Sequence, residues 1–210
     1  MNVKNYLLKN IKLQTEHETL VKYKNKHFSK ENLKEDFEDA IFESCKFSEL
    51  EFKFSNFKNC IFRDCDFAGS TFDSVGFFRC SFPGSKLSFS DFGEVSIQNC
   101  DFNGTLMENC IFQKFKAGSK NERKTFDLKT SSFVNTNLSG SVFVMCNLAE
   151  VNFNKSILEG SVFERCDLTK TDFTECKIMR ASFTDCKIKE TILDVNGYMD
   201  FGSSHGFVLK

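Results

Sequence analysis

Large apolar residues recur at every fifth position along most of the chain. Between residues 37 and 112, all sixteen of these centre positions hold Phe, Leu, Ile or Met. The residues two places before them, over 40–110, are small except for Leu50. A second run of fourteen centres, over 128–193, continues the pattern one residue out of phase. A period of five matches neither an α-helix nor a simple strand, so it predicts a backbone that turns a corner every five residues.

The centre and the small residue of each unit are expected to point inward, and the other three to face solvent or form the corner. If a coil has four faces, each inward pair repeats on the same face every 20 residues. Adjacent coils would then stack at strand spacing, and thirty units would make a rod of about 7.5 coils, roughly 36 Å long. Backbone groups would pair between coils, which satisfies the buried N–H and C=O groups.

In the second run, Phe alternates with Leu or Ile at the centre position. A four-faced coil then places Phe on two opposite faces and the aliphatic residues on the other two. Such columns allow offset stacking of the rings along the axis. The expected columns are Phe133, Phe153 and Phe173 on one face, and Phe143, Phe163 and Phe183 on the facing one.

All ten cysteines fall on the small inward position. Cysteines 20 residues apart would lie near disulfide range in stacked coils, and metal binding between coils is a further alternative. Ser, Ala and Val replace Cys freely at this position, however, and a buried free Cys behaves as a small apolar residue. We therefore expect reduced packing residues. They form columns such as Cys60, Cys80 and Cys100, and Cys146, Cys166 and Cys186.

Composition narrows the class of protein. The 210 residues include 27 Phe but one Pro, and the net charge is -1 with a pI of about 6.3. These totals favour neither direct nucleic-acid binding nor a strongly acidic surface. No apolar run is long enough for a membrane span, and the first residues lack a signal-peptide core, so we expect a cytoplasmic protein with no membrane association.

Residues typical of catalysis are missing from the pattern. The chain has no glycine-rich phosphate loop and no nucleophile elbow. Its three histidines, His17, His27 and His205, lie outside the repeats and lack metal-ligand spacing. We therefore expect no enzyme activity, no catalytic or cofactor-binding residues, no cofactor and no metal site.

The repeat is interrupted between residues 114 and 125, where KFKAGSKNERKT departs from the inward pattern. We interpret this segment as a loop projecting from a corner. It is either a solvated insertion, which solenoids tolerate, or an arm that contacts a partner or an anionic surface. The candidate contact residues are its five bases, Lys114, Lys116, Lys120, Arg123 and Lys124.

Both ends of the chain lie outside the repeat. Residues 1–36 are expected to cap the open edge of the first coil with a short helix or a strand. The first run of coils, 37–113, precedes the loop, and the second run, 126–193, follows it. Residues 194–210 form a tail after the second run. The tail could cover the last coil or form a dimer interface. Its apolar residues are Tyr198, Met199, Phe201, Phe207, Val208 and Leu209.

Surface features vary along the predicted rod. Residues 37–112 carry twelve acids and six bases, a net charge of -6, whereas 126–193 carry nine acids and eight bases, a net charge of -1. Four phenylalanines fall outside the inward positions, and if exposed and clustered they would mark a protein-binding patch. They are Phe54, Phe78, Phe89 and Phe115.

The repeat units resemble the pentapeptide-repeat family pattern A-[DN]-[LF]-x-x. Examples are CDFAG at 65–69, CDFNG at 100–104, TNLSG at 136–140, CNLAE at 146–150 and CDLTK at 166–170. The resemblance extends over about three quarters of the chain. It implies an all-β fold, a right-handed quadrilateral β-helix of about 7–8 coils.

Within that family, the length, the interrupting loop and the apolar tail are similar to the Qnr and mycobacterial fluoroquinolone-resistance proteins. That resemblance implies a homodimer joined at its C-terminal end. It also implies a DNA mimic that binds a type II topoisomerase, DNA gyrase or topoisomerase IV, and protects it from quinolones, with the 114–125 loop touching the enzyme. The alternatives are a protein-interaction scaffold for another partner, or a self-resistance protein encoded beside a toxin.

Overall fold

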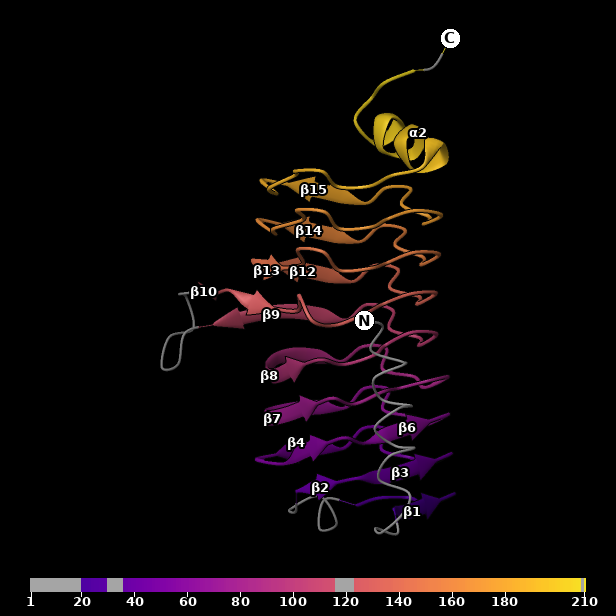
Figure 1. Ribbon diagram of the computed structural model, residues 1–210, viewed down its shortest axis with the longest axis vertical. Coiled ribbons are helices and arrows are strands. Elements are labelled where there is room, and N and C mark those ends of the chain that lie inside the picture. The colour runs from indigo at the N-terminus through magenta and orange to yellow at the C-terminus, as the bar shows by residue number, and fades with distance from the viewer. Residues whose placement is uncertain (1–19, 30–35, 116–122, 209) are drawn as a thin grey trace.

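The computed structural model describes residues 20–29, 36–115, 123–208 and 210. Figure 1 shows a stack of β coils that rises from β1 to β15 and ends in the helix α2. The strands run across the long axis of the stack, and each coil lies on the one before it. The predicted β-solenoid is therefore confirmed, with about seven turns.

Three sheets form the walls of the stack. One has the order β1 (Val21–Lys24), β3 (Ala40–Glu43), β6 (Ile61–Arg63). The longest runs from β2 (Phe37–Glu38) through β5 (Asn56–Lys58), β7 (Thr71–Phe78), β8 (Asp91–Gln98), β9 (Ile111–Phe115), β12 (Val142–Val144) and β14 (Val162–Glu164) to β15 (Ser182–Thr184). In addition, β4 (Glu51–Lys53) pairs with β7, and β10 (Arg123–Lys124) pairs with β9. The third sheet joins β11 (Phe126–Asp127) and β13 (Cys146–Asn147).

The pairing register confirms the twenty-residue coil. Strands of neighbouring coils pair in parallel, as where Phe57 lies opposite Phe77. Across the interruption, Phe112 lies opposite Phe143, which is 31 residues later. This spacing exceeds the twenty-residue coil by eleven residues. The insertion therefore does not interrupt the parallel pairing of β9 with β12.

Toward the N-terminus, the ladder begins before the five-residue pattern does. Strand β1 pairs in parallel with β3, and the ring of Tyr23 stacks on Phe42 with centroids 4.9 Å apart. Phe28 likewise stacks on Phe47 at 4.5 Å. Tyr23 and Phe28 thus occupy core positions one coil before Phe42 and Phe47. Each pair is 19 residues apart in the sequence rather than twenty.

The core consists of columns of stacked side chains. Every centre position from 37 to 178 is buried. Phe153 stacks on Phe133 and on Phe173, with ring centroids 5.2 Å apart in both pairs, and meets Phe163 of the facing column edge-on at 6.2 Å. The predicted columns are therefore confirmed. The centre Ile188 is an exception, because it is exposed where no further coil covers it.

The small inward position also carries a hydrogen bond. Its side chain donates to the carbonyl oxygen of a centre residue one coil earlier, as Ser70 does to Phe47 at 2.6 Å and Thr171 to Leu148 at 2.9 Å. The thiol of Cys100 makes the same contact with the carbonyl of Phe77, at 3.3 Å. Ser, Thr and Cys are thus interchangeable because each is small and can donate.

The cysteines pack as reduced residues. All ten are free, and nine of them are buried, with Cys186 at the last coil partly exposed. Desolvation raises the pKa of the Cys110 and Cys176 thiols to about 12, because burial disfavours the thiolate.

The corners use left-handed backbone. The residue two positions after most centres has a positive φ. In the described chain, 22 non-glycine residues have a positive φ. Asn, Asp and Gly tolerate this conformation best. Asn59, Asn99 and Asn109 fit that preference, whereas Phe54 and Phe89 do not.

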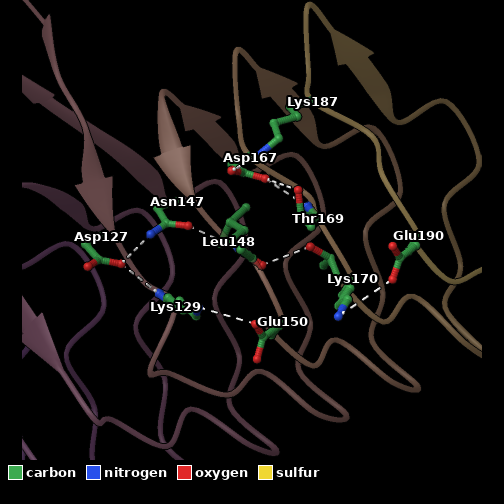
Figure 2. A network of polar contacts seen from close by, with 12 residues as sticks. Asp127, Lys129, Asn147, Leu148, Glu150, Asp167, Thr169, Lys170, Lys187 and Glu190 are labelled. Atoms are coloured by element: carbon green, nitrogen blue, oxygen red, sulfur yellow. Dashed lines mark hydrogen bonds and ion pairs between the residues drawn. The ribbon is translucent and has the colours of Figure 1, made fainter.

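Polar ladders link successive coils on the outer surface (Figure 2). The Asp167 carboxylate accepts hydrogen bonds from the Thr169 hydroxyl at 2.6 Å and from the Lys187 ammonium, one coil later, at 2.9 Å. These bonds, that of Thr169 first, lower the pKa of Asp167 to about 2. In the same region, Lys170 lies 3.7 Å from Glu190.

Core truncation tests the inward assignment. Phe153→Ala should lower the free energy of unfolding by about 3–5 kcal/mol, because it leaves a cavity between two stacked rings. Cys166→Asp should cost more by burying a charge without a partner. Cys166→Ala should cost little, since it removes only a weak thiol hydrogen bond. Urea denaturation of the three variants checks the order, and a harmless Cys166→Asp would contradict it.

Acidification tests the Asp167 ladder. A carboxylate whose pKa is lowered by folding stabilises the native state above its unfolded pKa and loses this contribution as the pH falls through its folded pKa. The stability difference between wild type and Asp167→Asn should therefore be constant above the ordinary value of 3.8 and shrink toward pH 2. Lys187→Met should reduce this difference without abolishing it, because Thr169 still donates. Denaturant titrations across this pH range provide the measurement, and a pH-independent difference would refute the assignment.

Candidate functional site

The interrupting segment begins and ends as an antiparallel hairpin on the side of the stack. Strand β10 pairs with β9, which places Lys124 opposite Lys114 and Arg123 opposite Phe115. Two lysines that face each other across a strand pair repel, so this hairpin presents concentrated positive charge. Figure 1 shows the paired strands β9 and β10 at one side of the coils.

Lys114 is anchored rather than extended into solvent. Its ammonium lies 4.7 Å from the centroid of the buried Phe126 ring, within the range of a cation–π contact. Partial burial is the main cause that lowers the pKa of Lys114, and the charge of Lys124 adds to it. Lys114 therefore supports the base of the hairpin. Of the other predicted contact residues, Lys116 and Lys120 lie outside the described residues.

The C-terminal end carries a helix set on the last coil. Helix α2 (Val195–Ser204) begins at Asp194, whose carboxylate accepts the backbone N–H groups of Gly197 and Glu175, both at 2.8 Å. These bonds lower the pKa of Asp194, because they favour the charged carboxylate. The cap thus ties the start of the helix to the coil beneath it.

The predicted tail residues, which lie on this helix and in the segment after it, divide into two groups. Phe201 packs against the core, with its ring centroid 5.8 Å from that of Phe183. Four others are exposed and Leu209 lies outside the described residues; the exposed ones are Tyr198, Met199, Phe207 and Val208. Ile188 and Ile192 of the last coil are exposed as well, so apolar surface continues from the helix onto the coil.

Ion pairs join charged side chains of successive coils on the walls. Lys129 lies 3.3 Å from Glu150, and Arg63 lies 2.7 Å from Glu43 one coil before it. Each of these pairs places a base beside an acid and so offsets part of the local negative charge.

The described residues contain no cluster of three or more metal-ligating side chains. An open pocket of about 340 Å³ lies between β15 and the end of α2, lined by residues that include Arg180, Phe183 and His205, and it contains no pair of carboxylates. Within the described chain, no helix is long and apolar enough to cross a membrane.

Of two features of the surface, the sequence pattern identified the first, the phenylalanines outside the core, and missed the second. The left-handed corners place the side chains of Phe54 and Phe89 in solvent, with 73% and 65% of their surfaces exposed. Phe78 is half-buried instead. The second feature is a shift in register between β7 and β8 that brings Glu94 opposite Asp73. The sequence carries no distinct signal for this shift, because Phe92, Val95 and Ile97 keep the same spacing as Phe72, Val75 and Phe77.

Comparison with solved structures finds low sequence identity over nearly whole chains. Full-length QnrB1, a plasmid-mediated fluoroquinolone resistance protein, is 16% identical over 90% of this chain and 99% of its own, with a TM-score of 0.45. HetL of Nostoc sp. strain PCC 7120, involved in heterocyst differentiation regulation, is 15% identical over 92% and 97%, with a TM-score of 0.28. Rfr23 of Cyanothece 51142 is 12% identical over 92% and 97%, with a TM-score of 0.21. No curated protein matches the sequence.

Comparison with protein-family models gives a more specific result. The model for pentapeptide repeats matches in eight copies, over residues 36–73, 51–88 and 146–185. These segments belong to both runs of coils, on either side of the hairpin. Their five-residue units are the ones whose centre side chains fill the core, and whose small side chains donate between coils. By its repeats and by the coil they build, this chain belongs to the pentapeptide-repeat proteins.

Proposed function

We propose that this protein is a non-enzymatic rod that binds other proteins and works as a homodimer joined through its C-terminal end. One observation carries the proposal. The described chain has twelve exposed large hydrophobic residues, and eight of them lie between 179 and 208. They are Met179, Ile188, Ile192, Val195, Tyr198, Met199, Phe207 and Val208.

The wall of the solenoid explains why this end is the place for association. Along the wall, backbone groups pair with the adjacent coil, and the large apolar side chains point inward. At the last coil no further coil follows, so α2 covers only part of the exposed end through Phe201. An apolar surface of this kind favours burial against a copy of itself, and a two-fold axis pairs the same patch on both subunits.

The hairpin is the proposed contact for the protein partner. Its bases include Lys114, Arg123 and Lys124, with Lys116 and Lys120 on the same segment of sequence. Because Lys114 is held over the Phe126 ring, the base of the hairpin is fixed to the wall. A fixed, positively charged projection suits an acidic surface on another protein.

A more specific candidate is binding to DNA gyrase or topoisomerase IV as a DNA mimic. It is favoured by the net charge of -6 over residues 37–112 and by the resemblance of the sequence to fluoroquinolone-resistance proteins. The ion pairs of Arg63 with Glu43 and of Lys129 with Glu150 support it less, because they place bases beside acids, whereas a DNA mimic presents continuous negative charge. We therefore place general protein binding first and topoisomerase binding second.

Disruption of the apolar end should give monomers. The double change Tyr198→Asp and Met199→Asp introduces charge into the proposed interface, where both side chains are exposed, so thermal stability should not fall through loss of core packing. Size-exclusion chromatography with light scattering should show a dimer for wild type and a monomer for the variant. The matched control, Val21→Asp, alters an exposed residue at the opposite end and should remain dimeric. A monomeric wild type would refute the proposal.

A gyrase supercoiling assay with ciprofloxacin separates the two candidates. DNA mimicry predicts that micromolar protein restores supercoiling in the presence of the drug. It further predicts that replacing residues 116–122 with a short glycine linker removes this protection, while the variant keeps the fold. Absence of protection by the wild-type dimer would reject the topoisomerase candidate and leave the general protein-binding role.

A further inference from the structure

We infer a second protein-binding surface on the wall formed by β4, β7 and β8, which takes an arginine-rich segment of a partner protein. We call it the aromatic strip and define it by Phe54, Phe89, Asp73, Asp91 and Glu94. The strip lies away from the C-terminal end and borders the base of the hairpin, because β8 pairs with β9 and the charge of Glu94 acts on Lys114. It requires neither dimerisation nor binding at the hairpin.

The two phenylalanines are the starting observation. Phe54 and Phe89 are the most exposed aromatic residues of the coils, and both occupy left-handed corners, with φ of 53° and 62°. A bulky side chain in that region costs energy relative to Asn or Gly. Neither ring packs on the core, so stability does not account for them. The left-handed corner recurs along the whole described solenoid, so the signal is the exposure of two large apolar rings, which indicates recognition.

Sheet pairing places both rings on one wall. Phe54 directly follows β4, and Phe89 lies two residues before β8. Strand β7 pairs with both β4 and β8, so it lies between them. The two rings therefore lie at diagonally opposite corners of the surface formed by β4, β7 and β8. Along the axis of the solenoid they are two coils, or about 10 Å, apart.

Carboxylates occupy the surface between the rings. The register shift brings Glu94 opposite Asp73, and Asp91 lies opposite Thr71 on the neighbouring strand. Like charges opposite each other destabilise a sheet unless a cation compensates them. Within the described residues, no ion pair at 4 Å or less includes these three acids. Two lysines lie nearby, since Lys53 is opposite Asp73 with its ammonium 2.8 Å from Glu51, and Lys114 interacts with Glu94, so the acids of this wall outnumber the bases.

The combination of rings and carboxylates defines the chemistry of the partner. Arginine satisfies both, because its guanidinium binds carboxylates through two hydrogen bonds and stacks on aromatic faces. A nucleic acid would be repelled by the three acids, and a purely apolar segment would leave them desolvated without a partner. An arginine-rich protein segment with apolar residues between the arginines is therefore the occupant that fits.

Replacement of the rings by a residue suited to the corner gives the sharpest test. Phe54→Asn with Phe89→Asn puts at both corners the residue already present at Asn59, Asn99 and Asn109, so the melting temperature should be unchanged or higher. The probe is a fluorescein-labelled decapeptide of alternating Arg and Leu, measured by fluorescence anisotropy. Binding should weaken at least about tenfold in this variant, as expected when aromatic anchors are lost.

A charge variant and two controls complete the experiment. Asp91→Asn with Glu94→Gln leaves the corners intact and should weaken binding similarly, more so at low salt. The matched control, Glu150→Asn with Asp185→Asn, removes two acids from the second run of coils and should bind as wild type does. A decapeptide with Glu in place of Arg should not bind. The inference is overturned if wild type does not bind the arginine peptide, or if the ring variant binds it as well as wild type.

Discussion

The structure depends on the pairing of each coil's backbone with the next. The N–H of Phe62 donates to the carbonyl of Ser81 at 2.8 Å, and equivalent bonds recur along the stack. Because this ladder is parallel and in register, residues twenty apart lie above one another. Each column of side chains then has a single role along the rod. A ring in the core stacks on the ring below it, and an outward acid lies next to the residue one coil away.

This constraint explains why so much of the fold follows from the sequence. A residue type that fits one position of a coil also fits the equivalent position of the other coils. The five-residue period can therefore be recognised in a single sequence. The hydrogen bond at the small position was less visible, since Ser70 and Cys100 were interpreted by size alone. Helix α2 was also hard to predict, because Gly197 and Gly202 disfavour helix. Its start depends on the Asp194 cap, which reaches a neighbouring coil.

For the candidate surfaces, sequence identifies the residues but not their neighbours. Phe54 and Phe89 could be recognised as lying outside the inward positions. Their left-handed corners and their common wall follow only from pairing, since they are 35 residues apart in the chain. The position of Glu94 depends on a shift in register at Gly93, which local alternation does not determine. In the hairpin, the bases were evident, whereas the contact of Lys114 with Phe126 was not.

The buried thiols give this rod built-in reporters of its own opening. A thiol held in the dry core with a pKa of about 12, as in Cys110, reacts slowly with alkylating reagents, because the reactive thiolate is scarce. Cys186, in the last coil, is the one partly exposed cysteine, but its hydrogen bond with Cys166 and its burial raise its pKa as well, so it too reacts only when its coil opens. In a solenoid each coil depends mainly on its neighbours, so the order of alkylation along the chain would record how unfolding spreads from the ends.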